Sequence, residues 1–230
     1  MNLRTLSIVC LLGTKLTLAQ TVQPMISEYR IHGDGKFAVT NNSLGPMVVL
    51  LEPMSFSITP EGRGVFRQLD PGIHVELSSS SLKLAPGQTS YVFYKADADA
   101  LPAWFTVYAT FSSPRHGEGL DVRLMLPHTV YLLQETPLAL EDVHVTDAHY
   151  SAETRKLICT LENVGRSLGR LQELHASGPH GSAEAGGFPL LPGNRRQVEL
   201  PWSGSEPPRE LVFRFEHFSI KKPVAAEATP

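Results

Sequence analysis

The stretch GLDVRLMLPHTVYLLQ, residues 119–134, has the pattern of one long β-strand. Leucine or valine stands at every second position of its first half, so these apolar side chains share one face: Leu120, Val122, Leu124 and Leu126. At about 3.3 Å per residue the stretch would reach roughly 50 Å, whereas strands are usually about 3–10 residues long. We therefore expect part of this strand to extend beyond its own domain.

Pro127 predicts that this strand lies at the edge of a sheet, because proline has no N–H to donate to a central ladder. An unpaired apolar edge favours aggregation, and only Asp121 and Arg123 add charge to it. Such an edge is useful where another chain's sheet is completed by it, which is recognition by β-augmentation. The alternative is that the four side chains pack inside their own sandwich, since half-buried strands alternate in the same way.

The rest of the chain consists of short β-rich runs, separated by turns that draw on 18 glycines and 18 prolines. An internal echo indicates two related halves, because L-x-P-G-x-x-x-x-V occurs at 84–92 and again at 190–198. Upstream of each copy an apolar strand stops at an asparagine, Asn41 or Asn163. We expect an all-β chain with two immunoglobulin-like sandwiches, residues 20–134 and a smaller 138–219, joined by the stiff residues 135–137. Residues 220–230 are expected to be a flexible tail.

Residues 1–19 have the features of a signal peptide: Arg4, an apolar run from Leu6 to Leu12, and a small-x-small ending at Ala19. The rival interpretations are a buried N-terminal strand or a membrane anchor, but this run is far shorter than the roughly 20 residues of a membrane span. Export predicts a periplasmic location. Cys10 leaves with the signal peptide, so Cys159 stands alone and is expected to be a packed small apolar residue.

Composition and motifs argue against several classes of function. The 20 Lys and Arg nearly balance the 23 Asp and Glu, so a nucleic-acid partner is not expected. No other apolar segment is long enough to span a membrane, so membrane insertion is not expected. Catalytic signatures such as HExxH and GxSxG are missing, so we expect no enzyme, catalytic residue or cofactor. No metal site is expected, because Asp147 and His149 share a strand face that His144 does not. His175 and His180 are placed in a solvated glycine-rich loop, residues 175–187.

The order of these parts resembles the periplasmic chaperones of the chaperone–usher pilus pathway, in a divergent form. The resemblance spans about residues 21–218 and rests on an exported chain, a turn-strand L-x-P-G-x-x-x-x-V, the strand LDVRLML and a smaller second sandwich. It implies a boomerang of two sandwiches that binds pilus subunits with an incomplete sandwich and delivers them to an outer-membrane usher. The donor residues would be Leu120, Val122, Leu124 and Leu126.

The resemblance also implies an anchor for the C-terminal carboxylate of the pilus subunit. The family uses an Arg on the first strand and a Lys on the last strand of the first domain. Arg30 can stand for the Arg, whereas His128 and Thr129 occupy the position of the Lys. The free protein is expected to cap its apolar edge by self-association. A structural or adhesive protein with two immunoglobulin-like domains and no chaperone role is the alternative function.

Overall fold

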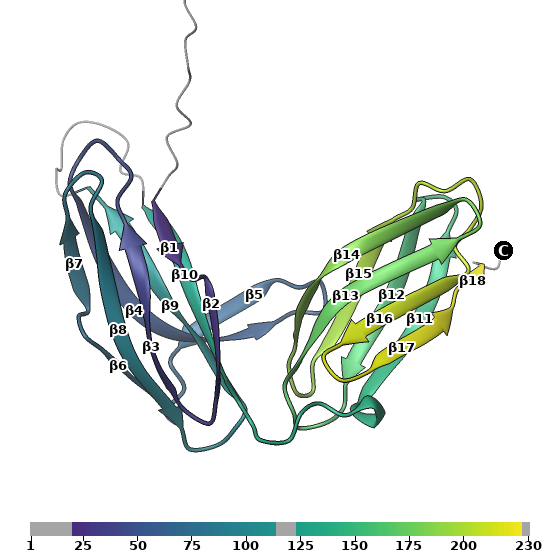
Figure 1. Cartoon of the computed structure of the whole chain (residues 1–230), viewed down its shortest axis with the longest axis horizontal. Coiled ribbons are helices and arrows are strands. Elements are labelled where there is room, and N and C mark those ends of the chain that lie inside the picture. Colours follow the sequence, from purple (N-terminus) through teal and green to yellow (C-terminus); the bar gives the residue numbers. More distant parts are fainter. Residues whose placement is uncertain (1–19, 114–122, 227–230) are drawn as a thin grey trace, which may run out of the picture.

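The computed structural model describes residues 20–113 and 123–226. They form two β-sandwiches that lie as the arms of a V (Figure 1). The only helix in this part of the chain is the short 3-10 helix η1 (Leu140–Asp142), where the chain enters the second sandwich. The predicted all-β fold, with two sandwiches in an L-shaped arrangement, is confirmed. The signal-peptide prediction falls on residues 1–19, outside the described residues.

The first sandwich consists of two sheets. One sheet has the order β1-β3-β8-β6, with β1 (Thr21–Gln23), β3 (Gly33–Thr40), β8 (Thr89–Ala98) and β6 (Ile73–Leu77). The other has the order β2-β10-β9-β4-β5, with β2 (Ile26–Arg30), β10 (Leu124–Leu133), β9 (Ala103–Ser112), β4 (Met47–Ile58) and β5 (Gly64–Gln68). A further strand, β7 (Ser81–Leu84), pairs with the first half of β4. The chain therefore changes sheets between β1 and β2, close to its start.

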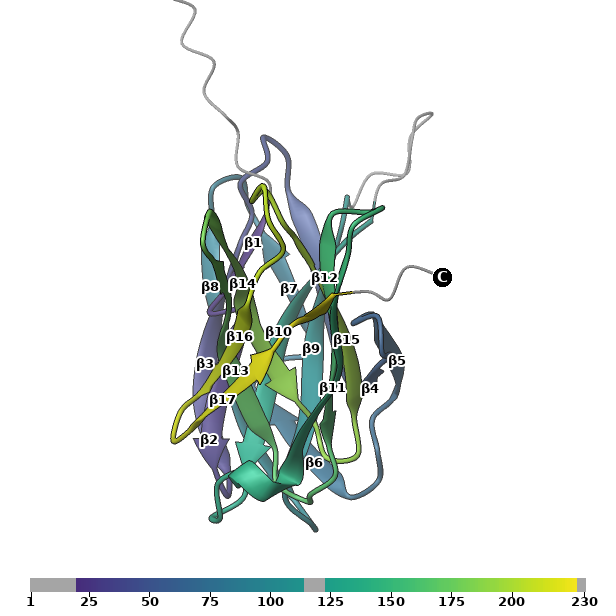
Figure 2. The same ribbon diagram turned by 90° about the vertical axis from the view of Figure 1, so that its right-hand side faces the viewer.

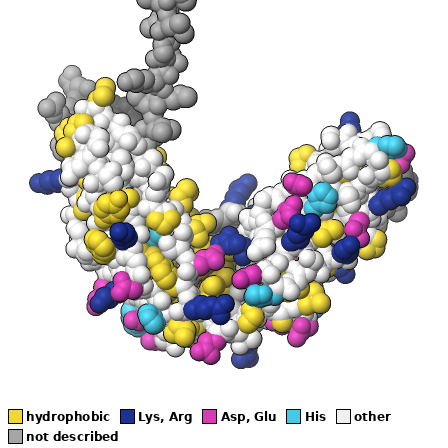
Figure 3. Space-filling model, in the orientation of Figure 1, with side chains coloured by type: hydrophobic (Ala, Val, Ile, Leu, Met, Phe, Trp, Pro, Cys, Tyr) yellow, Lys and Arg dark blue, Asp and Glu magenta, His cyan; other side chains and the backbone are white. Residues whose placement is uncertain are grey.

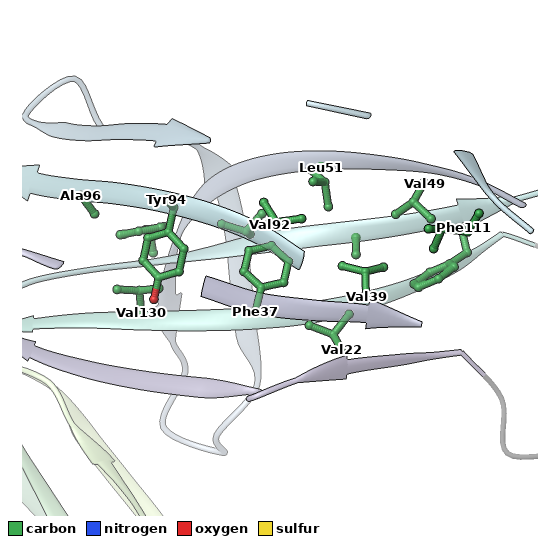
Figure 4. Close-up of a cluster of buried hydrophobic side chains, with 14 of the residues drawn as sticks. Val22, Phe37, Val39, Val49, Leu51, Val92, Tyr94, Ala96, Phe111 and Val130 are labelled. Carbon is green, nitrogen blue, oxygen red and sulfur yellow. The ribbon is translucent and has the colours of Figure 1, made fainter. Parts of the chain in front are cut away.

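The core of the first sandwich forms from the alternating apolar residues of both sheets (Figure 4). On β10 the even-numbered residues face this core, and Val130 and Leu132 are completely buried. Their neighbours on β9 are the buried Phe105 and Ala103. The strand pattern of the sequence thus places one face of β10 inward along its whole length.

The second sandwich also has two sheets, which lie face to face in the side view (Figure 2). One has the order β15-β12-β11-β18, with β15 (Arg195–Pro201), β12 (Lys156–Asn163), β11 (Val143–Ser151) and β18 (Ala225–Ala226). The other has the order β14-β13-β16-β17, with β14 (Gly181–Leu190), β13 (Gly169–Gly178), β16 (Glu210–Phe215) and β17 (Ser219–Pro223). Cys159 is buried in their shared core, as expected of a packed thiol.

Two sequence predictions about the second sandwich are wrong. Residues 175–187 do not form a loop, because most of them belong to the β13–β14 hairpin, with His175 paired to Glu184. Alanines supply the inward-facing positions of this hairpin, and Gly187 lets β14 pass close to the carbonyl of Leu171 at a bulge in β13. Residues 220–226 are also not a flexible tail, because β17 pairs with β16 and β18 pairs with β11. The boundaries at 134 and 138 stay predictions.

The two sandwiches touch through a small apolar cluster and a hairpin. Phe56 and Tyr131 of the first sandwich pack with Leu168 and Leu191 of the second. The β4–β5 hairpin reaches across toward the second sandwich (Figure 1), where the Asn194 side chain donates a hydrogen bond of 2.7 Å to the Ile58 carbonyl. These contacts hold the arms of the V together at more than one point.

Candidate functional site

The first half of β10 has a strand on one side only. From Leu124 to Leu132 it pairs with β9, whereas β2 pairs with it only from Thr129 to Leu133. Within the described residues, Leu124 to His128 therefore form an edge to which no strand pairs on the side opposite β9. The predicted edge position applies to this half of the strand. It is wrong for the second half, which β2 covers in parallel.

The open edge carries backbone groups that the protein does not use. The Thr129 N–H points away from β9, since it donates to the Met25 carbonyl at 2.8 Å. This is the side of β10 that is open from Leu124 to His128. Backbone groups of alternate residues point the same way, so the N–H and C=O of Met125 and the C=O of Pro127 also point to the open side. Pro127 lacks an N–H where a central strand would need one for its neighbour. Proline thus stands where its missing donor costs the protein no ladder bond.

Side chains along this edge present a partly apolar rim. Leu124 and Leu126 are half-buried and pack against the core of the first sandwich from its margin. Met125 points to the opposite face and is 50% exposed. Leu120 and Val122, the two other predicted donor residues, lie outside the described residues. The two described leucines are therefore neither sealed in the core nor fully in solvent.

His128 occupies the position where the open edge ends. It is 0% exposed and stacks on Phe37, with ring centroids 4.4 Å apart. Its Nδ1–H donates to the Pro24 carbonyl at 2.7 Å, and its Nε2 accepts from the Tyr94 hydroxyl at 3.1 Å. Tyr94 in turn accepts from Tyr29 at 2.8 Å. Burial lowers the pKa of His128, because a low-polarity surrounding disfavours the imidazolium ion.

These contacts correct the sequence-based assignment of an anchor to His128. Both ring nitrogens have partners inside the sandwich, so the side chain does not reach the surface. Thr129 pairs with Ile26, whereas Arg30 pairs with Leu133. These two pairs are four positions apart along the strands, which is about 13 Å. The fold therefore does not bring His128 and Thr129 together with Arg30. The sequence missed the inward direction of His128 because a lone histidine in a strand carries no signal of it.

Arg30 instead lines a cleft between the two sandwiches, with a volume of about 300 Å³. Arg170 of β13 lies in the same cleft, and its guanidinium binds the Glu28 carboxylate of the first sandwich at 2.6 and 2.9 Å. Arg170 also lies over the ring of Tyr131, 5.6 Å from its centre. Sequence reasoning did not single out Arg170, because only the fold brings this residue of the second half to the first.

Cys159 lacks the environment of a reactive thiol. Burial raises the pKa of Cys159 to about 12, so its reactive thiolate form is disfavoured.

Within residues 20–113 and 123–226, no helix has the length and apolar character needed to cross a membrane.

The sequence matches no family model and no curated protein, but solved structures share its fold. A chain of the Salmonella enterica SafA pilin complex with the SafB chaperone has a TM-score of 0.55 at 12% identity, covering 90% of this chain and 96% of that one. The YadV chaperone has a TM-score of 0.54 at 7% identity, covering 89% and 98%. The E. coli chaperone DraB has a TM-score of 0.53 at 11% identity, covering 90% and 97%.

These alignments extend over both sandwiches, because each covers about nine tenths of the present chain. A class 5 fimbriae chaperone, CfaA, also aligns over 90% of the chain, with a TM-score of 0.52 at 8% identity. The chain therefore has the two-domain β-sandwich fold of the fimbrial chaperones.

Proposed function

We propose that this protein is a periplasmic chaperone that binds pilus subunits with an incomplete sandwich and delivers them to an outer-membrane usher. The observation that carries the proposal is the unpaired first half of β10, with free backbone groups and leucines at its margin. A strand of the subunit would pair with this edge, and β10 would complete the sheet of the subunit in return. The shared fold supports the proposal, since one aligned structure is a pilin with its chaperone.

In this proposal Leu124 and Leu126, together with Leu120 and Val122, enter the apolar groove of the subunit. Burial of a leucine or valine side chain is worth roughly 1.5–3 kcal/mol, so each residue that moves from the margin into a subunit adds to the affinity. Pro127 and the start of the β2 pairing at Thr129 limit the length of the lent strand. No catalytic residue takes part, because the client is bound and released without a change of covalent bonds.

Arg30 is the proposed anchor for the C-terminal carboxylate of the pilus subunit. Its side chain is exposed in the cleft and has no carboxylate partner among the described residues. Arg170 lies in the same cleft, where its charge is balanced by Glu28 and leaves Arg30 as the arginine without a carboxylate partner among the described residues that line the cleft. An arginine can hold a carboxylate through two parallel hydrogen bonds.

The test uses backbone chemistry at Met125, where the free N–H points to the open edge. Met125→Pro removes this donor, whereas the matched Met125→Ala keeps it and shortens the same exposed side chain. Each variant is co-expressed with a pilus subunit from the same gene cluster, and the complex is purified through the subunit. We expect Met125→Pro to weaken capture at least about fivefold, because one backbone hydrogen bond contributes on the order of 1 kcal/mol. Met125→Ala should capture nearly as much subunit as the parent protein.

Circular dichroism controls for folding in both variants. Equal capture by Met125→Pro and Met125→Ala, with both folded, would show that β10 is not the strand offered to the subunit. Failure of the parent protein to capture any subunit would instead favour a structural or adhesive protein with two sandwiches.

A further inference from the structure

A histidine and two glutamates meet on the outer face of the second sandwich, far along the chain from β10. Glu173 and His175 are two residues apart on β13 and therefore point the same way. Glu184 is the direct partner of His175 on the neighbouring strand β14. One ligand atom from each residue lies within 4.8 Å of the other two. Figure 3 shows acidic, histidine and basic side chains gathered on this arm of the molecule.

The spacing of the His175 and Glu184 side chains fits a shared metal ion. The His175 Nδ1 and the Glu184 Oε1 are 3.2 Å apart. Two ligands at about 2.0–2.1 Å from a tetrahedral ion lie roughly 3.3 Å from each other. An ion can therefore replace the proton that now joins them with little movement of either side chain. The Glu173 carboxylate then approaches as the third ligand from the same face.

The surroundings leave room for an ion and for its remaining ligands. Gly186 lies opposite Glu173 on β14, and a Cβ there would meet no atom within 4 Å. The side chain of Glu184 is 65% exposed, so the open side of the cluster faces solvent. Water, or a group of another molecule, can therefore occupy the fourth position. Both ligand strands are paired along their length, which holds the backbone of the three residues in place.

One basic side chain competes with an ion. The Arg214 Nη1 lies 3.2 Å from the Glu173 Oε2 and neutralises that carboxylate. The Arg214 side chain is 59% exposed, so it can turn into water at small cost. Removing this arginine should therefore strengthen metal binding. A structural role of the cluster without metal would not give that result.

We propose that Glu173, His175 and Glu184 bind a first-row transition metal ion such as Zn²⁺, through one imidazole nitrogen and two carboxylate oxygens. A site with an imidazole suits Zn²⁺, Cu²⁺ or Ni²⁺, whereas Ca²⁺ and Mg²⁺ prefer oxygen ligands only. The site lies on a different sandwich from the β10 edge, and it does not depend on the proposed chaperone function.

Isothermal titration of the purified chain with Zn²⁺ tests this site. We expect saturable binding of one ion per chain, and no comparable binding of Ca²⁺. His175→Gln and Glu184→Gln should each lower the affinity by more than about tenfold, because each removes a ligand. His217→Gln is the matched control, since His217 is an exposed histidine of the same sandwich. Arg214→Gln should raise the affinity by releasing Glu173.

Circular dichroism establishes that each variant is folded before titration. X-ray absorption by the zinc-loaded protein should show one nitrogen from imidazole among oxygen neighbours. The proposal is overturned if the parent chain shows no saturable Zn²⁺ binding. It is also overturned if His175→Gln binds Zn²⁺ as well as His217→Gln does.

Discussion

At the scale of single residues, His128 connects the interior of the first sandwich to the open edge of β10. Its imidazole joins the backbone at Pro24, where the chain changes sheets, to Tyr94 of β8. The next residue, Thr129, makes the first hydrogen bond between β10 and the β2 side. Burial favours the neutral imidazole here, in which Nδ1 donates to the Pro24 carbonyl and Nε2 accepts from the tyrosine. His128 thus lies at the point where β10 stops being an open edge.

Acid should weaken the first sandwich through this residue. Burial lowers the pKa of His128 in the folded protein, whereas in the unfolded chain a histidine has a pKa of about 6.5. The unfolded chain therefore binds a proton first, so the stabilising contribution is complete above about pH 6.5 and is lost as the pH falls further. Urea unfolding at pH 7.5 and pH 5.5 measures the effect.

His128→Phe keeps the ring stacked on Phe37 but cannot be protonated. We expect it to be less stable than the parent at pH 7.5, since it loses both hydrogen bonds, and to lose less stability on acidification. His217→Gln, at an exposed histidine, should retain the pH response of the parent. Identical acid responses of the parent and His128→Phe would contradict this assignment.

At the scale of elements, the same turn is built in both sandwiches. Asn41 ends β3 after Thr40, and its amide nitrogen donates to the carbonyls of Leu84 and Ala85, just before a Pro-Gly turn. Asn163 ends β12 and donates to the Leu190 carbonyl before the second Pro-Gly turn. Both asparagines are buried, and Gly87 and Gly193 have the positive φ of 71° and 65° that this turn requires. The asparagine and the L-x-P-G motif therefore form one structural unit in each half.

Removing this asparagine should destabilise its sandwich. Asn163→Ala leaves the carbonyls of Leu190 and Ser167 without their donor, and each buried unsatisfied group costs about 1–3 kcal/mol. We expect the free energy of unfolding to fall by about 2–4 kcal/mol in urea titrations. Gln172→Ala, at an exposed residue of the same sandwich, should change it by less than about 0.5 kcal/mol. A loss for Asn163→Ala as small as that of Gln172→Ala would contradict the role of the buried amide.

The elements also show what the sequence can and cannot predict. Strand alternation and the repeated asparagine and L-x-P-G motifs suffice for the all-β fold, because these patterns are local. Pro127 indicates an edge, but only the fold shows that β2 covers the second half of β10. The β13–β14 hairpin is missed because its inward positions are alanine and glycine, which resemble a loop. Arg170 meets Glu28 only because the fold brings the two sandwiches together. The Glu173 cluster forms only because β13 pairs with β14. The composition of the sequence shows neither contact.

At the scale of the whole molecule, the sandwiches contact each other both at the β4–β5 hairpin and around the cleft that Arg30 lines. At one place the Ile58 and Pro60 carbonyls of the β4–β5 hairpin accept hydrogen bonds from Asn194 and Gln197, at 2.7 and 2.8 Å. At another, Gln134 exchanges two hydrogen bonds with the backbone of Leu168, both at 3.1 Å. The Arg170–Glu28 pair adds a third contact at the cleft. Contacts at separate places restrain rotation of one arm against the other more than a linker alone does.

Shortening the hairpin should therefore loosen the V without unfolding either arm. Replacing residues 59–63, TPEGR, by Asn-Gly gives a two-residue turn that suits a hairpin but removes the tip that reaches Gln197. The variant loses the hydrogen bond from Gln197 to the Pro60 carbonyl, worth on the order of 1 kcal/mol, while both cores remain intact. Small-angle X-ray scattering should show a broader distribution of interatomic distances at the longest separations. Lys156→Ala, which breaks an exposed ion pair inside the second sandwich, should scatter as the parent does. If the shortened protein and the parent scatter alike, the remaining contacts, which include the cluster of Phe56, Tyr131, Leu168 and Leu191, suffice to hold the arms.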